Sequence, residues 1–194
     1  MRKHLYSAAA GLAMASLAAM CLVGCGTKKA ASEMAARQET TVLSPEKSLP
    51  EVASNPGFIT ILEAAEAVIN PGKLDEVARK YGYKTVENYE VSRLGTYEKM
   101  LYKNCILGKS LGHGTYADTP RALKKGTSSY VATAHETVIV GVFNLAAYQN
   151  LLNQLQAAGY RLASKGYEDR YTNGMIDAYC YAERKTIRLQ RAQP

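Results

Sequence analysis

The sequence is poor in the residues that most often carry out chemistry. Its 194 residues include no tryptophan, only 3 histidines and only 4 cysteines. One of those histidines, His4, lies in the first charged segment, which leaves two for a metal site or a catalytic pair. Lysine and arginine form no dense cluster, and no pair of carboxylates stands out from the ordinary acidic residues. The missing carboxylate pair argues against glycosidase chemistry, and the export signal at the start of the chain argues against a nucleic-acid partner.

The first 24 residues have the pattern of an export signal. Arg2 and Lys3 open the chain, residues 5–22 are apolar or small without a charge, and residues 22–25 read Leu-Val-Gly-Cys. These four residues resemble the lipobox of bacterial lipoproteins. The resemblance implies cleavage before Cys25, diacylglycerol on its sulfur, and a membrane as the partner of this end. The alternative is an ordinary secretory signal, or a membrane span that contains a cysteine.

Residues 25–56 are predicted to be the lipidated cysteine and a flexible tether, because they contain few large apolar side chains. Residues 57–194 then form a single domain. Without residues 1–24 the chain carries 22 Lys and Arg against 17 Asp and Glu. The expected location is the cell envelope, on the outer membrane facing the periplasm or the surface if the organism has two membranes. No cofactor and no metal site are indicated.

Two cysteines, Cys105 and Cys180, remain as thiols in the predicted domain. An exported compartment usually permits disulfides, so these residues form a candidate pair. A bridge between them would close a long loop and contribute about 4 kcal/mol in the chain-entropy model. The alternative is two small buried residues that never meet.

Apolar periodicity predicts three helices, and the later two end in the same way, with Gly82-Tyr83 and Gly159-Tyr160. Asn144 is the expected cap of the third helix. A short strand over residues 58–62 is the alternative to the first helix. Residues 130–143 are expected to form either one long strand or a hairpin turning near residues 134–136. The helices are predicted over residues 58–69, 73–81 and 145–158, and the strands over residues 84–91, 97–107, 130–143, 161–169 and 175–189.

This order of elements predicts an α+β domain, in which an antiparallel sheet of about five or six strands carries two or three helices on one face. The two halves also resemble each other. A shift of 77 places Leu74 on Leu151 and Gly82 on Gly159, and a shift of 75 places Met100 on Met175 and Cys105 on Cys180. The pattern indicates a helix–strand–strand unit used twice, with the two cysteines at equivalent strand positions.

Tyrosine is common, with 14 residues against 2 phenylalanines. A tyrosine suits a half-exposed pleated surface, because its ring packs while its hydroxyl stays in water. Ordinary packing is one interpretation. The other is a recognition face for a glycan or a protein, formed with the irregular residues 108–129 by Tyr102, Tyr116, Tyr167, Tyr171, Tyr179 and Tyr181.

Three short motifs partly match known catalytic or phosphate-binding patterns. Residues 108–112 read Gly-Lys-Ser-Leu-Gly and fit the G-x-S-x-G pattern of α/β-hydrolases, but the helix that must follow is not predicted. A serine hydrolase using Ser110 with His113 or His135 is therefore an alternative function. Residues 108–110 also match the end of the phosphate-loop pattern G-x-x-x-x-G-K-[ST], but Lys103 stands where the pattern requires its first glycine. Residues 135–139 begin like the zinc motif H-E-x-x-H, with Ile139 where the second histidine belongs.

Residues 138–144, which read Val-Ile-Val-Gly-Val-Phe-Asn, precede the predicted helix that ends in residues 155–161, Leu-Gln-Ala-Ala-Gly-Tyr-Arg. Together they resemble the first half of a SPOR domain, a family that binds denuded peptidoglycan. The resemblance covers residues 138–161. Residues 175–189 lack the second V-x-V-G-x-[FY] run of that family, which puts its ligand in doubt for this chain.

The sequence thus predicts a membrane-anchored envelope lipoprotein whose domain is a non-enzymatic binding module for an envelope protein or glycan. A structural subunit of a larger envelope complex is the alternative that involves no small ligand.

Overall fold

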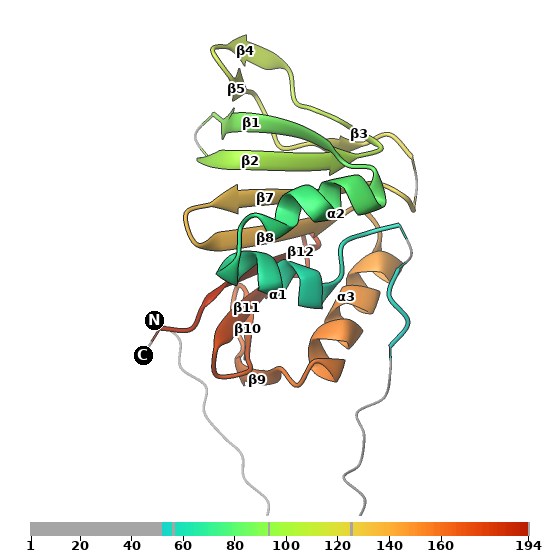
Figure 1. Cartoon of the computed structure of the whole chain (residues 1–194), viewed down its shortest axis with the longest axis vertical. Helices are drawn as coiled ribbons and strands as arrows, with labels where there is room; N and C mark the ends of the chain where they lie inside the picture. The colour runs from blue at the N-terminus through green and yellow to red at the C-terminus, as the bar shows by residue number, and fades with distance from the viewer. Residues whose placement is uncertain (1–51, 56, 93, 125, 194) are drawn as a thin grey trace, which may run out of the picture. The chain divides into compact units, whose positions relative to one another are not determined.

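Figure 1 shows the protein as a computed structural model, which describes residues 52–55, 57–92, 94–124 and 126–193. The predicted export signal, Cys25 and nearly all of the predicted tether lie outside these residues. In the described part, three helices pack on one face of a sheet. They are α1 (Ile61–Ile69), α2 (Lys73–Tyr81) and α3 (Leu145–Ala157).

The strands are short and follow one another mostly through hairpins. The first group is β1 (Lys84–Val91), β2 (Gly95–Lys103), β3 (Cys105–Ile106), β4 (Ser110–Gly112), β5 (Thr115–Tyr116) and β6 (Arg121–Ala122). The second is β7 (Ser129–Ala134), β8 (Thr137–Val142), β9 (Arg161–Ser164), β10 (Asp169–Thr172), β11 (Ile176–Tyr181) and β12 (Thr186–Arg191).

Ten of these strands form one sheet in the order β4-β5-β1-β2-β7-β8-β12-β11-β10-β9, while β3 and β6 pair separately. Every pairing in the large sheet is antiparallel except that of β1 with β5. The α+β class is therefore confirmed, but the predicted five or six strands are too few. The predicted strands over residues 161–169 and 175–189 are wrong, because each range is broken by a turn into two paired strands, β9 and β10 in the first and β11 and β12 in the second. Residues 110–116 add β4 and β5, which are too short to show a period of two in the sequence.

The helix boundaries follow local capping chemistry. Thr60 caps α1 in a capping box with Glu63, so the helix starts after Thr60 and not at Phe58. Gly82 adopts the left-handed conformation at φ 69°, and Tyr83 N–H donates to the carbonyl of Ala78 at 2.9 Å. Gly159, at φ 83°, and Tyr160 end α3 in the same way. These two helix ends, and the Asn144 cap of α3, confirm the sequence predictions.

Alternating residues of the strands divide between the two faces of the sheet. On the helix side, Val131, Val140, Ile187 and Leu189 join the buried faces of all three helices in the main core. On the opposite side, a second apolar cluster lies on the first half of the sheet only. It contains Tyr89, Val91, Met100, Tyr130 and Ala132, with Val86, Tyr97, Tyr102, Leu107, Tyr116, Ile139 and Phe143 packed against it.

The two halves of the domain share one topology. In each, a helix is followed by an antiparallel meander of four strands: α2 with β1, β2, β7 and β8, and α3 with β9, β10, β11 and β12. The fourth strands, β8 and β12, pair with each other at the centre of the sheet. Their register is the one that a twofold axis between the two strands would produce. The axis would exchange the two ends of the ladder, so that Gly141 and Thr186 at one end correspond to Gln190 and Thr137 at the other.

The strand ladders confirm one of the two sequence alignments and correct the other. Lys84 opens β1 and Arg161 opens β9, as the shift of 77 predicts. The shift of 75 is wrong, because Met100 lies on β2 while Met175 directly precedes β11. The cause is the connection that follows β2, which spans residues 104–128, whereas only residues 173–175 connect β10 to β11.

Candidate functional site

The second half of the sheet presents a polar surface where the first half presents its apolar cluster. Across β10, β11 and β12, the side chains of Arg170, Tyr179 and Arg188 stand in one row, since each is paired with the next in the strand ladders. The neighbouring residues Ala178 and Ile187 point the other way, into the helix-side core. We call the surface formed by Arg170, Asp177, Tyr179, Tyr181 and Arg188, with Glu168 and Tyr167 beside them, the β10–β12 face.

Arg188 is held in place by three contacts. Its guanidinium carbon lies 4.1 Å from the centroid of the Tyr179 ring, Nη1 donates to Gln190 Oε1 at 2.7 Å, and Nη2 donates to Glu168 Oε2. A guanidinium stacked on an aromatic face and paired with a carboxylate loses much of its rotational freedom. The planar group is therefore oriented before any partner arrives.

Asp177 is the least satisfied polar residue of this face. It is 4 % exposed, and its Oδ1 has no hydrogen-bond partner among the described residues. Its Oδ2 lies 3.7 Å from Nε of Arg170, which is an ion pair but too long for a good hydrogen bond. Buried polar groups in native proteins almost always have a partner. This oxygen therefore requires an explanation.

Two tyrosines form the outer part of the face. The ring centroids of Tyr167 and Tyr181 are 4.6 Å apart, Tyr167 Oη donates to Tyr181 Oη at 2.7 Å, and Tyr181 Oη donates to Glu183 Oε2 at 2.7 Å. The hydrogen bonds with Tyr167 and Glu183 raise the pKa of Tyr181 well above its ordinary value. Tyr167 is 78 % exposed, so it offers a ring edge and face to a partner.

The first half of the sheet shows what covers the equivalent positions there. The twofold relation places Met100 where Arg170 stands, Ala132 where Tyr179 stands, and Ile139 where Arg188 stands. Residues 104–128 pack Leu107 and Tyr116 against that apolar surface. The ring of Tyr116 stacks on Tyr89 with centroids 4.2 Å apart, and Tyr89 Oη donates to the carbonyl of Asp118 at 3.0 Å.

The β10–β12 face is exposed by comparison. The three-residue connection at 173–175 is too short to reach back over it, since three residues span at most about 10 Å. Tyr179, Tyr181 and Arg188 are only half-buried, and Arg170 is exposed. Among the described residues, this is the part of the sheet where a polar and aromatic surface lies open to a partner.

The six tyrosines predicted to form a recognition surface do not all come together. Tyr167, Tyr179 and Tyr181 meet on the β10–β12 face. Tyr102 and Tyr116 pack against the apolar cluster of the first half, and Tyr171 packs on the helix-side core. The sequence predicts that residues 108–129 lie beside the tyrosine surface. In the structure they cover the first half of the sheet, where Tyr102 and Tyr116 lie, and not the β10–β12 face.

Sequence reasoning missed Arg170, Asp177, Arg188 and Glu168. One signal was available, because residues 176–181 alternate Ile-Asp-Ala-Tyr-Cys-Tyr and so place Asp177 with the two tyrosines. The pairing of Arg188 with Glu168 depends on the order of β10, β11 and β12, which the sequence alone does not define.

The candidate disulfide is not formed, since Cys105 and Cys180 are both free and buried. Cys105 follows β2 and donates from Sγ to the carbonyls of Lys103 and Ser129, whereas Cys180 lies on β11. Cys105 lies on β3 with its Sγ beside Ser129 at the start of β7, and β8 and β12 separate β7 from β11. Neighbouring strands are about 4.8 Å apart and a disulfide needs Cα atoms within about 7 Å, so the two thiols cannot be joined in this fold.

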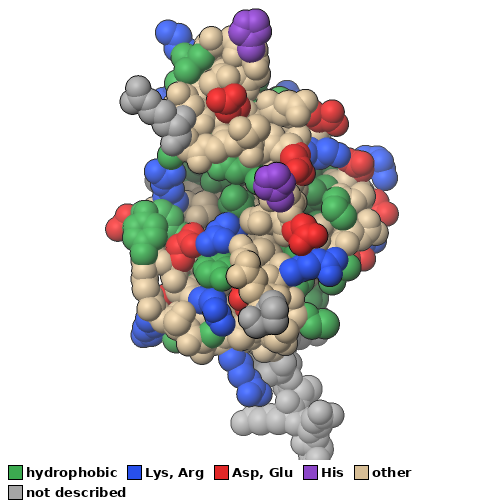
Figure 2. All heavy atoms as spheres, turned by 90° about the vertical axis from the view of Figure 1, so that its left-hand side faces the viewer, with side chains coloured by type: hydrophobic (Ala, Val, Ile, Leu, Met, Phe, Trp, Pro, Cys, Tyr) green, Lys and Arg blue, Asp and Glu red, His purple; other side chains and the backbone are tan. Residues whose placement is uncertain are grey.

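The serine-hydrolase alternative requires a strand–turn–helix (a nucleophile elbow) at Ser110, and no helix directly follows this residue in the described part of the chain. This residue begins β4, which turns directly into β5, and its Oγ accepts a hydrogen bond from Gly112 N–H at 3.3 Å. His113 lies in that turn, whereas His135 lies in the turn between β7 and β8. Figure 2 shows the two described histidines apart on the same face, one at the top of the view and one near its middle.

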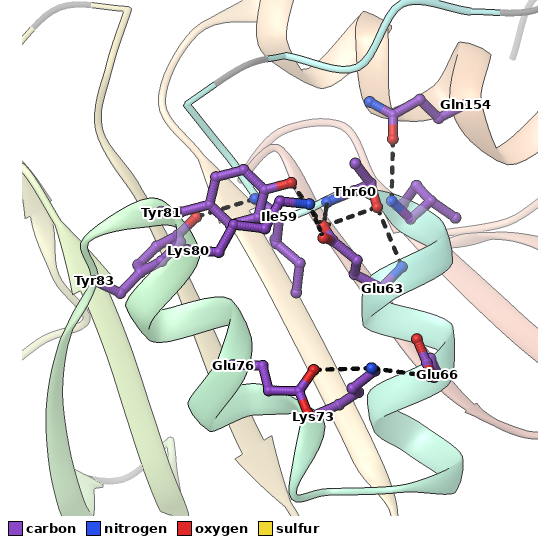
Figure 3. A network of polar contacts seen from close by, with 11 residues as sticks. Ile59, Thr60, Glu63, Glu66, Lys73, Glu76, Lys80, Tyr81, Tyr83 and Gln154 are labelled. Atoms are coloured by element: carbon purple, nitrogen blue, oxygen red, sulfur yellow. Dashed lines mark hydrogen bonds and ion pairs between the residues drawn. The ribbon is translucent and has the colours of Figure 1, made fainter.

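A second polar cluster joins α1 to α2 (Figure 3). Glu63 accepts hydrogen bonds from Thr60, from Lys80 Nζ at 2.6 Å and from Tyr81 Oη at 2.9 Å. Further along, Lys73 Nζ lies between Glu66 at 3.5 Å and Glu76 at 2.8 Å. Each carboxylate here is paired within the protein, so this cluster stabilises the helix pair and offers little to a ligand.

The described residues contain no group of three or more His, Cys, Asp and Glu residues that could hold a metal ion. None of the helices that the structure describes has the length and apolar content needed to cross a bilayer. Comparison with protein-family models, with curated proteins and with solved structures finds no match to this chain. The resemblances to bacterial lipoproteins and to SPOR domains therefore remain predictions from the sequence.

Proposed function

We propose that this chain is an envelope lipoprotein anchored through Cys25, and that its domain is a non-enzymatic binding module that contacts a partner protein through the β10–β12 face. The observation that carries the proposal is the row of Arg170, which is exposed, and Tyr179 and Arg188, which are half-buried, at positions that are apolar and covered in the first half of the sheet. The tether predicted over residues 25–56 would let the domain reach a partner away from the membrane.

The composition of the face favours a protein over a glycan. Arginine and tyrosine are the residues that, with tryptophan, contribute most to the energy of protein–protein interfaces. Here Arg188 lies on the ring of Tyr179 and so occupies the surface that a sugar ring would need for stacking. Figure 2 shows acidic and basic side chains mixed across the adjoining side of the molecule, a pattern that gives orientation to a protein partner.

The topology supports a duplicated origin as part of this proposal. We infer that a helix with four strands was used twice, that the first copy acquired the covering connection at residues 104–128, and that the second copy kept its face open. If the protein were instead a structural subunit of an envelope complex, it would use the same face. The contact with its partner would then be permanent.

Photo-cross-linking in native membranes tests the proposal. A photoreactive phenylalanine analogue at Tyr167 should form an adduct with one protein, whereas the same group at Leu62 should form none. Leu62 is 67 % exposed on α1, on the helix side of the sheet, and serves as the matched control. Equal labelling from both positions, an adduct containing only glycan, or no adduct from Tyr167 would contradict the proposal.

A further inference from the structure

Asp177 and Arg170 have an arrangement that protein stability alone does not explain. The carboxylate is buried, one of its oxygens has no hydrogen-bond partner, and its counterion stands at 3.7 Å. The side chain of Arg170 is 44 % exposed, against 5 % for Asp177. The cation therefore lies at the surface over a carboxylate that it only partly satisfies.

The groups around Asp177 do not supply the missing donor. The residues directly opposite it in the strand ladders are Thr172 on β10 and Gln190 on β12. Gln190 Oε1 already accepts from Arg188, whose guanidinium is turned toward Glu168 and Tyr179. Thr172 Oγ1 likewise accepts from Gly174 N–H at 3.1 Å, and neither residue donates a hydrogen bond to Asp177 Oδ1.

We propose that Asp177 is the point at which the β10–β12 face recognises a guanidinium side chain on an extended segment of the partner protein. An arginine of the partner would take the place of Arg170 and bind both oxygens of Asp177 through its two parallel N–H groups. Arg170 would move into solvent, where its exposed side chain has room. This inference rests on the proposed function and names the chemistry of its partner.

Two observations favour a polypeptide as the occupant. The first half of the same sheet is covered at the equivalent positions by an irregular polypeptide, residues 104–128, so this sheet geometry accommodates such a cover. The open face also contains an acidic acceptor that lacks a donor, which complements a basic side chain. Arginine fits better than lysine, because its planar fork matches the two carboxylate oxygens.

The test uses the full chain in a neutral detergent, labelled with ¹⁵N, and two synthetic probes, acetyl-Gly-Arg-Gly-amide and acetyl-Gly-Glu-Gly-amide. The arginine peptide should shift the amide signals of Asp177, Thr172 and Gln190, and the glutamate peptide should leave them unchanged. Arg170→Ala should bind the arginine peptide roughly tenfold more tightly, since removing a competing group raises the competent fraction. Asp177→Asn should lose the preference for arginine.

Asp177→Asn replaces the carboxylate with an amide of nearly the same shape, and melting curves of both variants establish that they are folded before the titration. An unchanged affinity in Arg170→Ala, or an Asp177→Asn variant that still prefers the arginine peptide, would overturn the inference. The proposed function is tested separately, because cross-linking from Tyr167 would still capture a partner protein if only the role of Asp177 were wrong.

Discussion

Ile139 and Arg188 lie directly opposite each other on β8 and β12, where the two halves of the sheet meet. They occupy equivalent positions in the two meanders, yet one packs against an apolar cluster and the other carries a stacked guanidinium. The boundary between the covered and the open surface of the sheet therefore runs between these two side chains.

Removing the side chain of Arg188 should lower the stability of the fold. Arg188→Ala loses the cation–π contact with Tyr179 and leaves Glu168 without its partner, so we expect the free energy of unfolding to fall by about 1 kcal/mol. Urea denaturation measures the change. Arg121→Ala, at an exposed position of β6, is the matched control and should remain within about 0.5 kcal/mol of the parent protein. Equal effects of the two substitutions would contradict the account.

Gly141 should tolerate no larger residue. A Cβ at this position would lie 2.2 Å from ring atoms of Tyr130, whose side chain is buried across the glycine. Gly141→Ala should therefore destabilise the domain by about 1–3 kcal/mol through overpacking. Gly166→Ala is the control, because its nearest heavy atom would be at an ordinary 3.6 Å. Thermal melting that ranks the two variants in the opposite order would show that Tyr130 does not lie on Gly141.

The stability of the α1–α2 pair should depend on pH through Glu63. Burial acts to raise the pKa of this carboxyl, but hydrogen bonds from Lys80, Thr60 and Tyr81 outweigh it and hold the pKa below its ordinary value of 4.5. A lowered pKa in the folded state stabilises the protein above the unfolded pKa. That stabilisation is lost as the pH falls through the folded value.

Unfolding measured between about pH 6 and pH 3 should therefore show a steeper loss of stability in the parent protein than in Glu63→Gln. Glu136→Gln provides the control, since Glu136 is an exposed residue of the β7–β8 turn. Parallel curves for the parent and Glu63→Gln would refute this role for the carboxylate.

The two thiols should be unreactive in the folded protein. Burial raises the pKa of Cys105 to about 11 and that of Cys180 to about 12, so both stay protonated near neutral pH. In a chain with Cys21→Ser and Cys25→Ser, alkylation should be slow under native conditions and rapid for both thiols in denaturant. Oxidation of the native protein should form no bridge, and a mass consistent with an intramolecular disulfide would contradict the strand order.

Local signals in the sequence predicted much of the fold. The bounds of α2 and β1 and the glycine ends of both helices depend on neighbouring residues, and each is present in the structure. The strand order could not be predicted in the same way. It depends on pairings such as β8 with β12, between residues far apart in the chain. The sequence alignment of Cys105 with Cys180 failed because residues 104–128 follow β2, whereas only three residues connect β10 to β11.

The candidate site was only partly predictable. A period of two along β11 groups Asp177, Tyr179 and Tyr181, and the abundance of tyrosine indicated a polar aromatic surface. Arg170 and Arg188 join that surface only after β10, β11 and β12 are placed side by side. Tyr171 looked equivalent to its neighbours in the sequence, but its position on β10 turns it toward the helices.

The most direct test is to observe which tyrosines respond to a partner. The full chain would be labelled with 3-fluorotyrosine, its ¹⁹F signals assigned by single Tyr→Phe substitutions, and the envelope protein fraction added in detergent. The signals of Tyr167, Tyr179 and Tyr181 should shift or broaden, while those of Tyr102, Tyr116 and Tyr171 should stay unchanged. A response confined to the latter three, or no response from any tyrosine, would contradict the assignment of the β10–β12 face as the binding surface.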